Sequence, residues 1–264
     1  MKNNIMPKLK KLTPHFIAVL LFIAISFIYF SPLIEGKVLE MVDIKNWQGM
    51  SKEVTDFREL TGEEALWTNS MFSGMPAYQI STRSNANLIQ YVVKFITLGM
   101  PRPASYLFLF LLGFYILLLS LKVDYRISII GAIAFAFSSY FFIIIEAGHT
   151  SKAHAIAYVP MIVAAILYTY RGKMLLGGFL TALTVGLEIY ANHLQITYYA
   201  LLMLIIIGIV QFLKDFRADN LLDFTKRTGV LICAGVLGSA TAYTNLATTM
   251  EYSKESTRGK SELT

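Results

Sequence analysis

The chain has 264 residues, of which 55% are hydrophobic and only 15% are charged. A soluble domain carries about 25% charged residues, so this composition excludes an ordinary soluble protein. The net charge of +6 accompanies no basic helix and no stacked aromatic platform, which argues against nucleic acid as a partner. The single cysteine, Cys233, excludes an intramolecular disulfide and a CxxC metal site.

The first apolar segment, residues 15–34, follows a short tail rich in lysine. The segment is longer than the apolar region of a secretory signal, and no small-residue cleavage site follows it. Thr13 and Pro14 are typical of a helix start. We therefore predict a cytoplasmic tail over 1–14, followed by an uncleaved transmembrane helix.

The polar stretch at 35–102 is far longer than any other connection between apolar segments. Loops of this length in membrane proteins usually build a surface domain. Residues 47–61 and 86–99 place apolar side chains at helical spacing, which predicts two amphipathic helices on the membrane surface. Gly74 and Pro76 indicate a tight turn between these helices.

Six further apolar segments follow, each of a length that crosses the hydrocarbon core of a bilayer at about 1.5 Å per residue. We therefore predict an all-α polytopic membrane protein with about seven transmembrane helices over 15–244. The polar residues 251–264 start no new element, and 245–264 is expected to lead into a further part of a longer protein. The expected bounds of the six helices are 103–121, 126–145, 153–170, 173–190, 194–213 and 226–244.

Lysine and arginine gather in the N-terminal tail and in the connections after the second, fourth and sixth helices. The positive-inside rule makes these segments cytoplasmic. The N-terminus is then inside, whereas the 35–102 loop and the 245–264 segment are extracytoplasmic.

The unusual polar residues are all expected on the extracytoplasmic side. Taken singly, Asp43 fits a solvated loop acid, and Trp67 fits the aromatic belt at a membrane surface. Glu188 lies inside an apolar helix, where an ionisable group is costly unless it is paired or functional. The other members are Glu146, His149, Lys152, His154, Asn192, His193, Gln195 and Glu251.

Together these residues predict a polar pocket at one end of the bundle. Its carboxylates could act as a general base or hold a divalent cation. Lys152, Arg83 or Arg102 could receive a phosphate. The spacings match no soluble catalytic motif such as HExxH, a P-loop or GxSxG.

Four segments carry a resemblance to a known family. They are WTNSMFSGMPAYQI (67–80), EAGHTSKAHAIAYVP (146–160), NHLQITYY (192–199) and EYSKESTRGKSELT (251–264), and together they resemble the YfhO-type bacterial membrane proteins in their Bacteroidetes-like form. The order of a first helix, a large outer loop with an early acid, and an outward-facing site also resembles the GT-C class of membrane glycosyltransferases. Family members are longer, so the chain corresponds to their N-terminal module, and the resemblance implies the bacterial cytoplasmic (inner) membrane.

The resemblance implies an inverting enzyme that moves a sugar from a polyprenyl-phosphate donor to an envelope glycopolymer, lipid or protein acceptor. It implies that Asp43 is the catalytic residue, as a general base or a metal ligand. A divalent cation stays open as a cofactor, with Asp43, Glu146 and His149 as its candidate ligands, because Val42 precedes Asp43 where some GT-C enzymes have a second acid. The implied substrate and donor contacts are Glu146, His149, Lys152, Glu188, His193, Arg83 and Trp67.

Two other functions compete with glycosyl transfer. A transporter or lipid flippase would place its sites near the membrane midplane in two related halves, and we find no such repeat. A non-catalytic envelope assembly protein would tolerate the loss of Asp43, Glu146 and His149 together.

Overall fold

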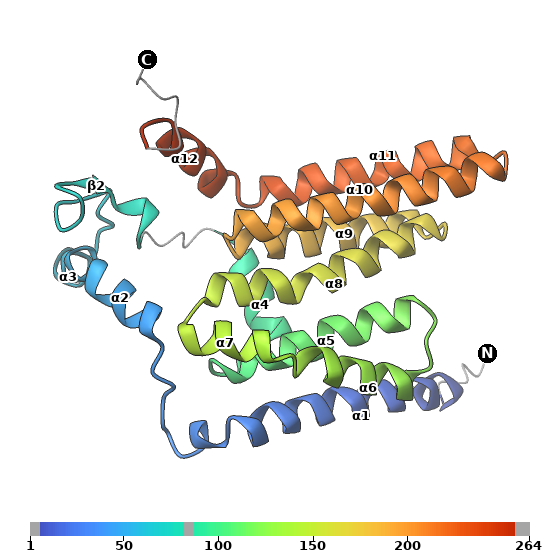
Figure 1. The fold of residues 1–264 in the computed structure, drawn as a ribbon, viewed down its shortest axis with the longest axis horizontal. Helices are drawn as coiled ribbons and strands as arrows, with labels where there is room; N and C mark the ends of the chain where they lie inside the picture. Colours follow the sequence, from blue (N-terminus) through green and yellow to red (C-terminus); the bar gives the residue numbers. More distant parts are fainter. Residues whose placement is uncertain (1–5, 82–86, 257–264) are drawn as a thin grey trace.

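The computed structural model describes residues 6–81 and 87–256, and this part of the chain is almost entirely α-helical (Figure 1). Its long helices lie side by side in a bundle, and strands occur within the described residues only as one short hairpin. The bundle helices are α1 (Met6–Tyr29), α5 (Ala104–Ser120), α6 (Tyr125–Ala136), α7 (Ser139–Ala147), α8 (Thr150–Tyr170), α9 (Met174–Tyr190), α10 (Leu194–Arg217) and α11 (Leu221–Ala240).

The core of the bundle is built on α5 and α8, whose facing side chains are buried. Small residues let the helix backbones approach closely. A Cβ atom on Gly113 of α5 would lie 2.5 Å from the carbonyl oxygen of Ala157 in α8. A Cβ atom on Gly238 of α11 would lie 2.6 Å from the carbonyl oxygen of Ala182 in α9. These glycines therefore set the separation of the helices that form the centre of the molecule.

The bundle has two distinct ends (Figure 1). We call one the loop end: it holds the end of α1 at Tyr29, the turn between α7 and α8, and the turn between α9 and α10. The opposite end holds the turns that join α5 to α6, α8 to α9, and α10 to α11. The loop end is the end at which the sequence places the unusual polar residues.

Within the described residues, three helices are long and apolar enough to cross a membrane: Leu12–Tyr29, Thr150–Tyr170 and Leu194–Arg217. The count rises to five if each of two bent helix pairs forms one span. The apolar helices α5 and α9 have 17 residues each and are shorter than these spans. The fold is therefore all-α and compatible with a membrane protein.

Both bent pairs depart from the predicted helices. The predicted helix 126–145 is two helices, α6 and α7, bent by 49°. Beyond α11 the chain turns by 76° into α12 (Tyr243–Lys254), a helix that was not predicted and that continues into the first of the polar residues 251–264. Apolar residues flank the break between α6 and α7 on both sides, whereas α12 is polar, so composition alone reveals neither feature. The predicted start of α1 at Pro14 is also wrong, because α1 begins at Met6.

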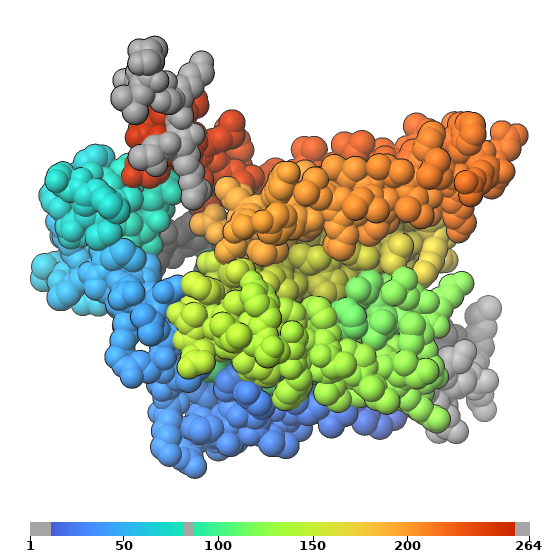
Figure 2. Space-filling view, viewed as in Figure 1, coloured from blue at the N-terminus to red at the C-terminus, as the bar shows by residue number. Residues whose placement is uncertain are grey.

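Residues 42–81 form a small folded body, which we call the loop unit. It stands beyond the loop end of the bundle and touches the region where α7 meets α8 (Figures 1 and 2). The predicted helix at 47–61 is two helices that meet at Ser51. A 3-10 turn (Ser31–Leu33) precedes the unit after α1. The unit contains α2 (Val42–Met50), α3 (Lys52–Thr61), β1 (Trp67–Thr68), β2 (Met75–Pro76) and the 3-10 helix η2 (Ala77–Gln79).

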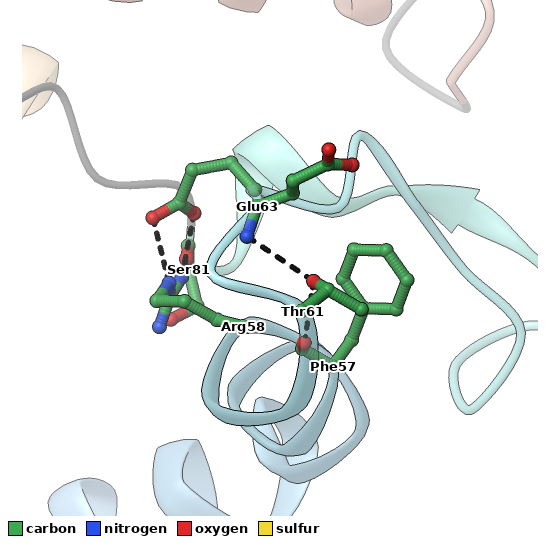
Figure 3. Close-up of polar contacts among 6 residues, drawn as sticks. Phe57, Arg58, Thr61, Glu63 and Ser81 are labelled. Atoms are coloured by element: carbon green, nitrogen blue, oxygen red, sulfur yellow. Dashed lines mark hydrogen bonds and ion pairs between the residues drawn. The ribbon is translucent and has the colours of Figure 1, made fainter.

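Polar contacts hold the loop unit together. Arg58 Nε and Nη2 donate to the two carboxylate oxygens of Glu64 at 2.6 and 2.7 Å, and Arg58 also donates to the carbonyl of Ser81 (Figure 3). The indole Nε1 of Trp47 donates to the carbonyl of Ile80 at 2.9 Å. Side chains of α2 and α3 thus fix the segment that follows the hairpin, so the unit is an ordered structure and not an extended loop.

The helix α4 (Ile89–Ile96) lies between the loop unit and α5 in the chain. The predicted amphipathic segment 86–99 contains it, although residue 86 lies outside the described residues. Ile89 is buried, and Val92, Val93 and Ile96 pack against the bundle core. Part of the apolar face that was expected to rest on lipid is therefore covered by protein.

Candidate functional site

The loop unit and the bundle meet at two polar side chains that the sequence analysis singled out. Asp43 lies in the first turn of α2, and His149 is the N-cap residue of α8. The Nδ1 atom of His149 lies 2.7 Å from Oδ2 of Asp43, and their side chains are 46% and 48% exposed. The pair therefore links the two parts of the molecule and still leaves the Asp43 carboxylate accessible.

Gly148 makes this approach possible. It ends α7 in the left-handed conformation, with φ at +91°, which favours glycine. A Cβ atom at this position would lie 3.2 Å from the Cβ of Asp43 and 3.0 Å from the Cβ of Met41. Gly148, in the sequence Glu-Ala-Gly-His-Thr, is thus needed both for the left-handed turn and for the close packing of α2 against that turn.

Two more basic residues lie near His149. The pKa of His193, the N-cap residue of α10, is lowered from its ordinary value of 6.5, chiefly because the ring is part-buried, and also because of the charges of Lys152 and His149. The lowered pKa favours the neutral form of the His193 ring. Its Nδ1 atom is buried and has no hydrogen-bond partner among the described residues. The Lys152 ammonium lies 5.2 Å from the centre of the Tyr140 ring.

The two glutamates of the predicted site do not join this cluster. Glu188 is 2% exposed, accepts a hydrogen bond of 3.0 Å from the hydroxyl of Thr197, and borders an apolar groove of about 800 Å³ formed by α8 to α11. Glu146 is exposed at the end of α7. Across residues 6–81 and 87–256, His, Cys, Asp and Glu side chains form no group of three or more that could hold a metal ion. Asp43 and His149 are thus a pair without Glu146 as a third ligand.

Trp67 takes a structural position in the hairpin. Its ring lies against Gly74, where a Cβ atom would lie 2.9 Å from the ring, and Gly74 has φ at +117°. The predicted turn at Gly74 is confirmed, with Pro76 paired to Trp67 across the hairpin. The indole is nevertheless 56% exposed and free to contact a ligand. Arg83 lies outside the described residues.

A carboxylate that the sequence analysis did not single out organises the same hairpin. Glu53 of α3 accepts hydrogen bonds from the Thr68 hydroxyl and from the backbone N–H groups of Asn69 and Ser70, the last two at 3.0 Å each. These bonds lower the pKa of Glu53, with the Thr68 hydroxyl as the largest cause. Nothing in the sequence separates Glu53 from the other acids of the loop, since its partners lie about 15 residues further along the chain.

A separate polar pocket of about 360 Å³ opens beside the Asp43–His149 pair, among α4, the start of α5, the start of α8 and the end of α9. The sequence does carry a signal for it. Thr150, His154 and Tyr158 follow one another at intervals of four residues, which places them on one face of α8. Its lining residues include Gln90, Arg102, Thr150, Ser151, His154, Tyr158, Tyr190, Asn192 and Asn245.

We compared the chain with protein-family models, curated proteins and solved structures. None of them matches it.

Proposed function

We propose that the protein is a multi-pass membrane glycosyltransferase of the GT-C type, similar to the YfhO-type family. It moves a sugar from a polyprenyl-phosphate donor to an envelope glycopolymer, lipid or protein on the extracytoplasmic side. The observation that carries this proposal is the 2.7 Å contact between Asp43 and His149, which fixes the first acid of the loop unit at the loop end of the bundle.

The proposal requires seven membrane crossings. The three long spans and the two bent pairs supply five, and the apolar helices α5 and α9 supply two more. The basic residues of the N-terminal tail and of the turns at the opposite end favour a cytoplasmic N-terminus in the bacterial inner membrane. The loop end, with Asp43, then faces the extracytoplasmic side.

In the proposed reaction Asp43 is the general base. An acceptor hydroxyl gives its proton to the Asp43 carboxylate while its oxygen attacks the anomeric carbon of the sugar from the face opposite the phosphate. The bond between that carbon and the phosphate oxygen breaks, and the polyprenyl phosphate leaves with the electron pair. His149 acts through Asp43 by holding its second oxygen, so it is a positioning residue.

The neighbouring basic groups suit a phosphorylated donor. Lys152 places positive charge at the loop end, and Arg83 remains a donor contact implied by the resemblance. His193 and the exposed side chains of Glu146 and Trp67 are proposed contacts to the sugar. Glu188 would influence the charge of the proposed site from the face of α9 that borders the apolar groove.

A donor screen tests the proposed function. The protein in membrane vesicles would be given radiolabelled polyprenyl-phosphate hexoses, and label entering an envelope acceptor is the expected result. Solute or lipid flux without a glycosyl donor, and without transfer, would favour the transporter or flippase. Full biological function in a variant with alanine at Asp43, Glu146 and His149 would favour an assembly role.

A further inference from the structure

The polar pocket beside the Asp43–His149 pair has the composition of an anion site. Among the described residues that line it none is acidic, and Arg102 contributes a guanidinium. Thr150 and Ser151 add hydroxyls from the first turn of α8, where the positive end of the helix dipole favours an anion. Its volume of about 360 Å³ falls within the usual range of small-molecule sites.

A second observation also indicates a ligand. Tyr158 lines the pocket one helical turn beyond His154 and is only 1% exposed. Its hydroxyl is buried and has no hydrogen-bond partner among the described residues. A buried hydroxyl without a partner is costly, and most buried polar groups in proteins are paired. This hydroxyl can donate to an oxygen atom of a molecule in the pocket.

The surroundings hold Tyr158 in place. Its ring stacks on the ring of His154, with centroids 6.1 Å apart and planes 3° apart. The His154 ring in turn meets the edge of Tyr106 at 4.9 Å. These contacts fix the wall of the pocket before a ligand arrives, which reduces the entropy that binding must overcome.

From these observations we propose that this pocket binds a phosphate group, held by Arg102 at the mouth, by the α8 hydroxyls, and by Tyr158 at the base. An arginine guanidinium matches the oxygens of phosphate in geometry and charge. The inference concerns binding alone, and it holds whether or not the protein transfers a sugar. The phosphate can belong to a lipid headgroup or to a free anion.

Binding measurements on the intact protein in nanodiscs separate these two sources. One arm titrates inorganic phosphate by calorimetry, and the other measures retention of a radiolabelled polyprenyl phosphate in discs of neutral lipid. We expect binding in at least one arm, with a Kd for inorganic phosphate of about 1 mM or tighter if the free anion is the ligand. Absence of binding in both arms would overturn the proposal.

Two variants test whether phosphate binds in this pocket. Arg102→Gln is expected to weaken it by about tenfold or more, because a charge-assisted hydrogen bond is lost. Tyr158→Phe, which keeps the ring and removes the hydroxyl, is expected to weaken it by a few-fold. Arg126→Gln is the matched control, since Arg126 is exposed at the opposite end of the bundle. Equal binding by the Arg102→Gln and Arg126→Gln variants would also overturn the proposal.

The phosphate-binding test does not depend on the proposed transferase activity. Phosphate binding that depends on Arg102, without any sugar transfer, would support the pocket and count against the transferase. Transfer that survives Arg102→Gln, with unchanged phosphate binding, would support the transferase and count against the pocket.

Discussion

His149 Nδ1 lies 2.7 Å from Asp43 Oδ2, although the two residues are separated by most of the loop and three bundle helices in the chain. The residue before His149 is Gly148, which has φ at +91° and leaves no room for a side chain against α2. The position of Asp43 relative to the bundle therefore depends on one residue that has no side chain.

We predict that Gly148→Ala loosens the loop unit. Alanine would adopt an unfavourable backbone conformation at a cost of about 1–2 kcal/mol, and its Cβ would also press on Asp43 and Met41. Hydrogen exchange of the α2 amides measures the loosening. The control is Gly172→Ala, because Gly172 has φ at +88° but no atom within 4 Å of its Cβ position. Equal exchange of α2 in both variants would contradict the role of the close contact.

The Glu53 carboxylate makes the hairpin sensitive to acid. Its pKa is lowered in the folded protein, so the unfolded segment binds protons more readily. The stabilisation is present above the ordinary pKa of 4.5 and is lost as pH falls through the lowered value. We expect the protection factors of the Asn69 and Ser70 amides, taken relative to the intrinsic exchange rate at each pH, to decrease below about pH 4.5 in the native protein. In Glu53→Gln these amides should already exchange faster at pH 7, with a weaker acid response; an unchanged profile would exclude this role.

The close approach of Gly113 in α5 to Ala157 in α8 allows a test of helix packing in the bundle. Gly113→Ala would place a methyl group 2.5 Å from the Ala157 carbonyl oxygen, so α5 and α8 must separate. We expect a loss of about 1–3 kcal/mol of stability, measured by thermal unfolding in detergent. Gly235→Ala on α11 is the control, because its Cβ meets open space and alanine favours the helix by up to about 1 kcal/mol. Similar melting of both variants would show that the close contact does not limit stability.

The apolar segments of the sequence locate the bundle helices well, since a run of apolar side chains has few alternatives to a buried or lipid-facing helix. The break at Ser138 was not predicted, because apolar segments flank it on both sides. The helix after Thr241 was not predicted, because its sequence is polar and gives no apolar run. The amphipathic pattern predicted the helix α4. It did not predict what covers the apolar face of α4, because the same face can pack against lipid or against protein.

The candidate site was predicted in part. The positive-inside rule places Asp43, His149, Lys152 and His193 on the same side of the membrane. The structure brings these four residues to one end of the bundle. Glu188 was expected with them, yet it borders the apolar groove, because one step around a helix changes which face a residue occupies. The hydrogen bonds that Glu53 accepts were not predicted, because they depend on the fold of the hairpin.

The most direct test of the proposed function is sugar transfer by Asp43→Asn, measured as label passing from a polyprenyl-phosphate hexose to an envelope acceptor in membrane vesicles. Asp56→Asn is the matched control, because Asp56 is an acid of the same loop unit that pairs only with the exposed Lys52 among the described residues. Loss of a general base predicts a decrease of about 10²–10⁴-fold in Asp43→Asn, with the protein still folded and Asp56→Asn close to the native rate. Native transfer by Asp43→Asn, or no transfer by the native protein from any such donor, would contradict the proposal.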